Sequence, residues 1–110
     1  MEKLQNSEVF SRKIQESPLL VVQFGSAQCA PCTAIEAKLD RFTQAFPEVQ
    51  SVYVSVEKFP ETAASQNVFT VPAVLVFAEG RLTLREAGYF SLDALLERVS
   101  RYAELLKSEE

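Results

Sequence analysis

The chain has 110 residues, of which 47% are hydrophobic and 24% charged, and it carries a formal net charge of −4 with no histidine. This length and composition predict one globular domain over residues 1–110. Basic residues are interleaved with acidic ones, which argues against nucleic-acid binding, and the apolar run of residues 19–22 is too short for a signal peptide or a membrane span. We therefore expect a cytoplasmic protein without nucleic-acid or membrane partners.

The first part of the chain predicts a helix followed by a buried strand. The helix is expected over residues 7–17, with Ser7 as its N-cap and Pro18 after its end, because apolar residues recur there at helical spacing, at Val9, Phe10 and Ile14. Residues 19–24 then form a nearly continuous apolar run whose one polar residue is Gln23. Such a run suits a strand that is buried on both faces of a parallel or mixed sheet.

A second helix and a second strand follow. Pro31 lies early in this helix and Pro47 closes it, and its apolar stripe consists of Ile35, Leu39, Phe42 and Phe46. Residues 52–56 alternate between valine and other residues, which is the period of a strand. Because the helix connects two consecutive strands, we expect these strands to pair in parallel.

The remaining chain predicts a short helix over residues 60–66, an antiparallel hairpin and a final helix. The hairpin strands, residues 73–77 and 82–86, flank a turn that contains Gly80 and form one edge of the sheet. Ser91 is the expected N-cap of an amphipathic helix that ends in a frayed acidic tail. The predicted fold class is α/β, with a central mixed sheet of four strands flanked by helices.

The two cysteines, Cys29 and Cys32, are separated by two residues at the predicted start of the second helix. A loop this short crosslinks almost nothing, so the pair points to local chemistry. The helix N-terminus offers free N–H groups and a partial positive charge to the nucleophilic thiolate. We expect Cys29 to attack and Cys32 to be the more buried resolving thiol. The alternatives are an inert pair or a metal site, which would need ligands from another chain or from carboxylates.

Three sequence features occur in a characteristic order along the chain. Phe24 ends a buried strand, Cys29-Ala30-Pro31-Cys32 opens a helix, and Val71-Pro72 precedes a hairpin strand. Together they resemble the thioredoxin family over nearly the whole chain. The resemblance implies the thioredoxin fold, a cis bond before Pro72 and a substrate-binding surface made of Gln28, Ala30, Pro31, Val71, Pro72, Gly88 and Tyr89. A trans proline at the strand start and an exposed loop aromatic at Tyr89 are the alternatives.

The sequence departs from that family beside the motif. Gln23 stands where thioredoxins usually bury an aspartate that assists the resolving cysteine, and an amide cannot act as a general base. We expect Gln23 to satisfy a neighbouring backbone group instead. Tyr53 replaces a frequent lysine, and Gln28 replaces the usual tryptophan. The family's N-terminal strand is expected to be short or absent, with Leu4 at most beginning a fifth, edge pairing.

The resemblance implies a thiol-disulfide oxidoreductase that reduces protein disulfides. Cys29 attacks a substrate disulfide and Cys32 resolves the mixed disulfide, so no organic cofactor or metal is needed. The protein would thereby serve the redox homeostasis of the cell. The electrons for disulfide reduction would come from a partner such as a thioredoxin reductase. We expect the protein to be a monomer. The alternative function is a protein-binding module with a slow or vestigial dithiol, which would hold its partner in the groove around Val71, Pro72 and Tyr89.

Overall fold

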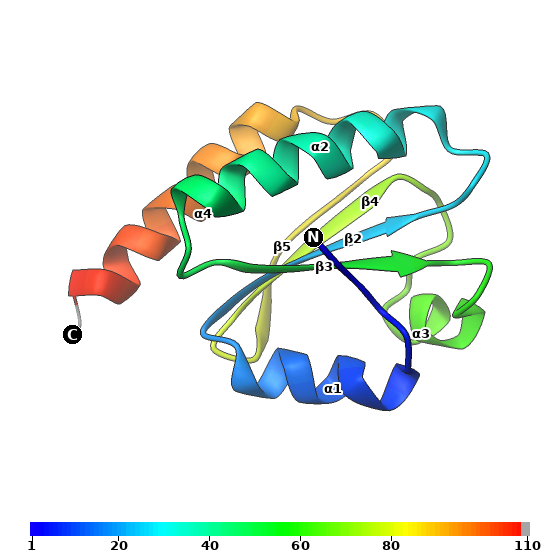
Figure 1. Ribbon diagram of the computed structural model, residues 1–110, viewed down its shortest axis with the longest axis horizontal. Coiled ribbons are helices and arrows are strands. Elements are labelled where there is room, and N and C mark those ends of the chain that lie inside the picture. Colours follow the sequence, from blue (N-terminus) through cyan, green and yellow to red (C-terminus); the bar gives the residue numbers. More distant parts are fainter. Residues whose placement is uncertain (109–110) are drawn as a thin grey trace.

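The computed structural model describes residues 1–108 as a five-stranded sheet with helices on both faces (Figure 1). In the order β1-β3-β2-β4-β5, the strands are β1 (Glu2–Lys3), β3 (Gln50–Ser55), β2 (Leu19–Gly25), β4 (Ala73–Ala78) and β5 (Arg81–Ala87). The helices are α1 (Ser7–Glu16), α2 (Ala30–Ala45), α3 (Pro60–Ser65) and α4 (Leu92–Ser108). The predicted acidic tail, residues 109–110, lies outside the described residues.

The sheet is mixed, as predicted. β2 pairs in parallel with β3 and antiparallel with β4, and the β4–β5 hairpin ends the sheet at β5. The fifth strand is the short β1, which pairs in parallel with β3 at the opposite edge. The backbone N–H of Leu4 extends this pairing by donating to the carbonyl oxygen of Tyr53 at 2.8 Å.

β2 divides the interior into two apolar cores. All seven of its residues are buried, in keeping with its apolar sequence. Leu20, Val22 and Phe24 pack with residues of α1 and α3 on one face, whereas Leu19 and Val21 pack with residues of α2 and α4 on the other. Figure 1 shows the two helix pairs on opposite sides of the sheet. Because side chains alternate along a strand, position 23 faces α2.

The helix starts agree with the predictions at α4 and differ at α1. The Ser91 hydroxyl accepts a hydrogen bond from the N–H of Ala94 at 3.1 Å, which confirms this N-cap. At α1 the N-cap is Asn6, whose Oδ1 accepts from the N–H of Glu8 at 2.8 Å, and Ser7 is already helical. Both residue types cap well, and the cap falls on Asn6 because its backbone is extended, after the chain leaves the edge of the sheet.

Candidate active site

The cysteine motif lies where β2 meets α2. β2 ends at Gly25, a three-residue loop follows, and Cys29 is the N-cap of α2. The N–H of Cys29 donates to the carbonyl oxygen of Ser26 at 3.2 Å, which closes this loop. A disulfide joins Cys29 to Cys32, with 5.4 Å between their Cα atoms. The motif therefore opens a helix directly after a buried strand, as predicted.

The two cysteines differ in exposure. Cys32, in the first turn of α2, is 3% exposed, whereas Cys29 is partly exposed and is followed by the exposed Ala30 and Pro31. The first turn of α2 contains no acidic residue, so no carboxylate there offsets the partial positive charge of the helix start. This environment suits a thiolate at Cys29 better than one at Cys32.

Gln23 holds the first turn of α2 against the sheet. Its side chain is fully buried, and its Nε2 donates to the carbonyl oxygen of Cys32 at 2.8 Å. This contact confirms that Gln23 satisfies a neighbouring backbone group. Its Oε1 is buried and has no hydrogen-bond partner among residues 1–108. The amide thus fixes the backbone of Cys32 without offering a group that can take a proton from its thiol.

Glu57 supports the loop before Cys29, although it was not among the predicted site residues. Its Oε1 accepts a hydrogen bond from the N–H of Ala27 at 2.8 Å. The contact arises because β2 and β3 are parallel, so Gly25 pairs with Ser55 and the residues after both strands meet at one edge of the sheet. The only sequence signal for it is an acidic residue just after the second predicted strand.

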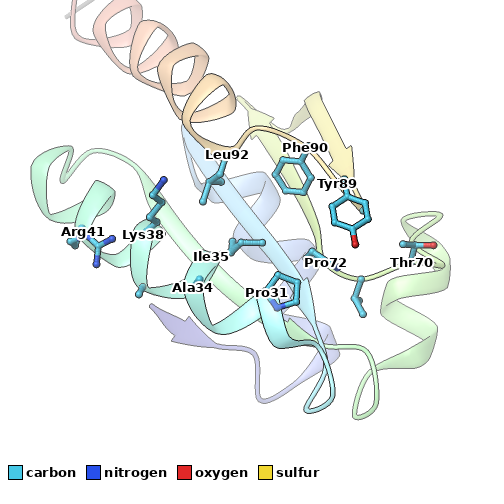
Figure 2. A pocket seen from close by; sticks show the side chains of 13 residues that line it. Pro31, Ala34, Ile35, Lys38, Arg41, Thr70, Pro72, Tyr89, Phe90 and Leu92 are labelled. Carbon is cyan, nitrogen blue, oxygen red and sulfur yellow. The ribbon is translucent and has the colours of Figure 1, made fainter.

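A groove of about 970 Å³ runs beside the motif (Figure 2). Of the seven predicted substrate-binding residues, the structure brings five together along it, namely Pro31, Val71, Pro72, Gly88 and Tyr89. Gln28 and Ala30 are exposed near the motif but do not line the groove. Residues that were not predicted extend it, among them Lys38 and Arg41 from α2 together with Phe90 and Leu92.

The far wall of the groove is formed by the segment before β4 and the segment after β5. The Val71–Pro72 peptide bond is cis, as the resemblance implies. The N–H of Gly88 donates to the carbonyl oxygen of Pro72 at 2.9 Å and so joins the two segments. The ring of Tyr89 is fully exposed, and Figure 2 shows it on the side of the groove opposite Pro31.

Residues 1–108 contain neither a cluster of metal-ligating side chains nor a helix that could span a membrane. No three side chains of the metal-ligating types His, Cys, Asp and Glu come together there as an ion site. None of the helices in this part of the chain combines the length and the apolar character that crossing a bilayer requires.

Comparisons with known proteins agree with this geometry. The family model for thioredoxin matches residues 1–101. Thioredoxin-2 of Pyricularia oryzae is 31% identical over 80 residues, which are 73% of this chain and 47% of that protein. The mitochondrial thioredoxin-3 of Saccharomyces cerevisiae is 30% identical over 73% of this chain and 63% of its own length. The chain thus spans about half to two thirds of these two relatives.

Solved structures confirm the predicted fold. The oxidised mitochondrial thioredoxin 3 of Saccharomyces cerevisiae superposes with a TM-score of 0.83 and 27% identity, covering 92% of this chain and 94% of that one. The thioredoxin of Fasciola hepatica gives a TM-score of 0.82 and 27% identity, covering 93% of this chain and 99% of its own. With its cysteine pair at the start of α2 and the groove beside it, the chain belongs to the thioredoxin family.

Proposed function

We propose that this protein is a thiol-disulfide oxidoreductase that reduces disulfide bonds in other proteins. The observation that carries the proposal is the Cys29–Cys32 disulfide at the N-terminus of α2, beside an open groove. Membership of the thioredoxin family supports it. The disulfide and the family membership do not favour the alternative, a protein-binding module with a slow or vestigial dithiol.

The reaction uses both cysteines in turn. In the reduced protein the Cys29 thiolate attacks one sulfur of a substrate disulfide, and the other substrate sulfur leaves as a thiolate that takes up a proton. Cys32 then loses its proton and attacks the Sγ of Cys29. The bond between Cys29 and the substrate breaks, the second substrate thiol is released, and the Cys29–Cys32 disulfide of the present structure is formed. The substrate gains two electrons and the protein loses them.

The groove is the proposed binding surface for the substrate. Pro31, Val71, Pro72, Gly88 and Tyr89 line it, and their apolar surface suits an extended segment of a protein. Gln28 and Ala30 keep a proposed role beside the exposed Cys29, outside the groove itself. The redox-active disulfide serves in place of a cofactor, and a reductase, such as a thioredoxin reductase, returns the two electrons to it.

We also propose that the chain acts as a single-domain monomer in the cytoplasm, where a reducing thiol pool favours its dithiol form. One relative is named as mitochondrial, so the compartment needs its own test. Fractionation of cells that express the native gene with a small C-terminal tag provides it. Recovery of the tagged protein with an organelle marker would contradict the cytoplasmic assignment.

Insulin reduction tests the proposed activity. With dithiothreitol as electron donor, the wild-type protein is expected to accelerate the precipitation of insulin B chains, and the double variant Cys29→Ser/Cys32→Ser is expected to match the rate without protein. Circular dichroism of the double variant confirms that it is folded. If the wild-type protein and the double variant give the same rate, the oxidoreductase proposal is wrong and a binding role takes its place.

A further inference from the structure

Tyr53 and Cys32 meet at a point where β2 has no side chain. A Cβ atom built on Gly25 would lie 2.5 Å from the hydroxyl oxygen of Tyr53 and 2.9 Å from the Sγ of Cys32. Real Cβ atoms do not make contacts this short, so the phenol and the sulfur together fill the space above Gly25. The glycine allows the hydroxyl of Tyr53 to approach the resolving sulfur.

The sheet register explains this approach. Tyr53 of β3 pairs with Gln23 of β2, so both side chains project toward α2. Gly25 lies two residues beyond Gln23 on the same face, beneath the first turn of α2. The long Tyr53 side chain extends from its own strand across the neighbouring glycine, and Cys32 reaches the same point from above.

Three charged groups face Tyr53. Burial raises the pKa of the Tyr53 hydroxyl, and the negative charges of Glu36 on α2 and Glu57 after β3 raise this pKa further. Lys3 of β1 lies over the ring, with its Nζ 5.9 Å from the ring centroid. The hydroxyl therefore keeps its proton at neutral pH and can donate a hydrogen bond.

Gln23 does not help Cys32 to ionise. Its Nε2 is committed to the carbonyl oxygen of Cys32, and an amide does not exchange a proton at neutral pH. A thiol with the low exposure of Cys32 is hard to ionise without a nearby donor or positive charge. Of the two polar side chains that face α2 at this register position, only Tyr53 carries a hydroxyl.

We propose that Tyr53 is a further residue of the redox site, whose hydroxyl donates a hydrogen bond to the Cys32 thiolate while the mixed disulfide is resolved. This inference rests on the proposed oxidoreductase function. Cys32 gives its proton to water, the hydroxyl of Tyr53 stabilises the resulting thiolate, and that thiolate attacks the Sγ of Cys29. The Cys29–Cys32 bond forms, the bond to the substrate breaks, and the departing substrate thiolate takes up a proton from water.

The test is the variant Tyr53→Phe, which keeps the ring and removes the hydroxyl. A mixed disulfide between Cys29 and a chromogenic aromatic thiol is formed, and its decay is followed by stopped flow between pH 6 and pH 9. We expect Tyr53→Phe to slow the decay roughly tenfold at pH 7. We also expect the pH midpoint of the decay, the pH at which its rate is half-maximal, to rise by about one unit. Loss of a hydrogen bond to a charged group destabilises the thiolate by an amount that corresponds to about one pH unit. The initial attack by Cys29 is expected to stay within about twofold of wild type.

Tyr102→Phe is the matched control, because Tyr102 is a partly buried tyrosine on α4 that packs against the core between the sheet and the helices α2 and α4. It is expected to leave the pH midpoint unchanged. An unchanged midpoint in Tyr53→Phe would overturn the inference while leaving the oxidoreductase proposal intact. Failure of the wild-type protein to form or resolve any mixed disulfide would instead contradict the proposed function itself.

A second substitution keeps the inference testable if Tyr53→Phe does not fold. Incorporation of 3-fluorotyrosine at position 53 preserves the shape of the side chain and makes the phenol a more acidic donor. Resolution at pH 7 is then expected to be as fast as in wild type or faster, with the midpoint at the same or lower pH. A midpoint shifted upward by this substitution would contradict hydrogen-bond donation by Tyr53.

Discussion

At the scale of single residues, the site depends on how one helical turn separates two chemically identical side chains. Cys29 is the N-cap of α2 and is partly exposed, whereas Cys32 is buried beneath the same turn. Gln23 secures the backbone of Cys32 and Glu57 secures the loop before Cys29. The two sulfurs are thereby held in different environments by a side chain of β2 and a side chain of the turn after β3.

This difference predicts unequal alkylation in the reduced protein. Cys29 is expected to react with iodoacetamide at least tenfold faster than Cys32 at pH 7, because the helix N-terminus and solvent both favour its thiolate. Quenching the reaction at short times and mapping the alkylated peptide by mass spectrometry measures both rates. Equal rates, or faster labelling of Cys32, would reverse the proposed roles of the two cysteines.

The raised pKa of Tyr53 predicts a loss of stability in alkaline solution. A pKa that is raised in the folded state means that this state binds the proton more tightly than the unfolded state does. The corresponding stabilisation is complete below about pH 10, the ordinary pKa of tyrosine, and is lost as the pH rises through the higher folded value. Urea unfolding of wild type and Tyr53→Phe between pH 9 and pH 11.5 measures it. Parallel declines in the two proteins would show that Tyr53 does not contribute.

At the scale of secondary-structure elements, the ends of helices and strands position the groove. α2 begins directly at the cysteine pair, and the Gly88 N–H joins the end of the hairpin to Pro72. The hairpin itself turns through Glu79 and Gly80, both with positive φ (51° and 82°), as a tight turn with two left-handed residues requires. Each of these ends depends on one or two hydrogen bonds or on a special backbone conformation.

The cap of α1 offers a direct test of this view. Asn6→Ala is expected to lower the free energy of unfolding by about 1 kcal/mol, because the N–H of Glu8 loses its acceptor. Ser7→Ala is the matched control and is expected to change it by less than about 0.5 kcal/mol, since Ser7 is exposed and lies inside the helix. Urea denaturation followed by circular dichroism measures both. A larger loss of unfolding free energy in Ser7→Ala than in Asn6→Ala would show that Ser7 is the N-cap.

At the scale of the whole molecule, one central strand ties both cores to the site. β2 is buried on both faces, contributes to each core and ends at the loop that leads to Cys29. α2 and α4 cover one face of the sheet, and α1 and α3 cover the other (Figure 1). Loss of packing on either face is therefore expected to destabilise the whole sheet rather than one helix.

Leu39→Ala tests this coupling. Leu39 of α2 is fully buried, and the substitution is expected to lower the free energy of unfolding by about 2–5 kcal/mol in one cooperative transition. Leu105→Ala on α4 is the control, because Leu105 is 61% exposed, and its effect is expected within about 0.5 kcal/mol. Urea unfolding followed by far-ultraviolet and near-ultraviolet circular dichroism measures both. Separate transitions for the two signals would show that α2 unfolds independently of the sheet.

The sequence alone determined the elements and the reactive pair, because these depend on local patterns. The apolar run of residues 19–24 predicted the central strand, the spacing of Cys29 and Cys32 predicted the redox motif, and Gly80 predicted the hairpin turn. Periodicity states which residues share a face of an element. The place of Cys32 one turn inside the helix predicted its burial, and the isolation of Gln23 in an apolar run predicted that its side chain would bond to the backbone.

Only the tertiary structure decided which distant residues meet at the site. Glu57 reaches the loop at Ala27, and the side chains of Tyr53 and Cys32 converge on the space above Gly25, because β2 and β3 pair in one particular register. A period of two assigns a side chain to a face but does not specify its cross-strand neighbour. The same holds for Gln28 and Ala30, since whether an exposed residue lines the groove depends on where α2 lies relative to the segments that flank the hairpin.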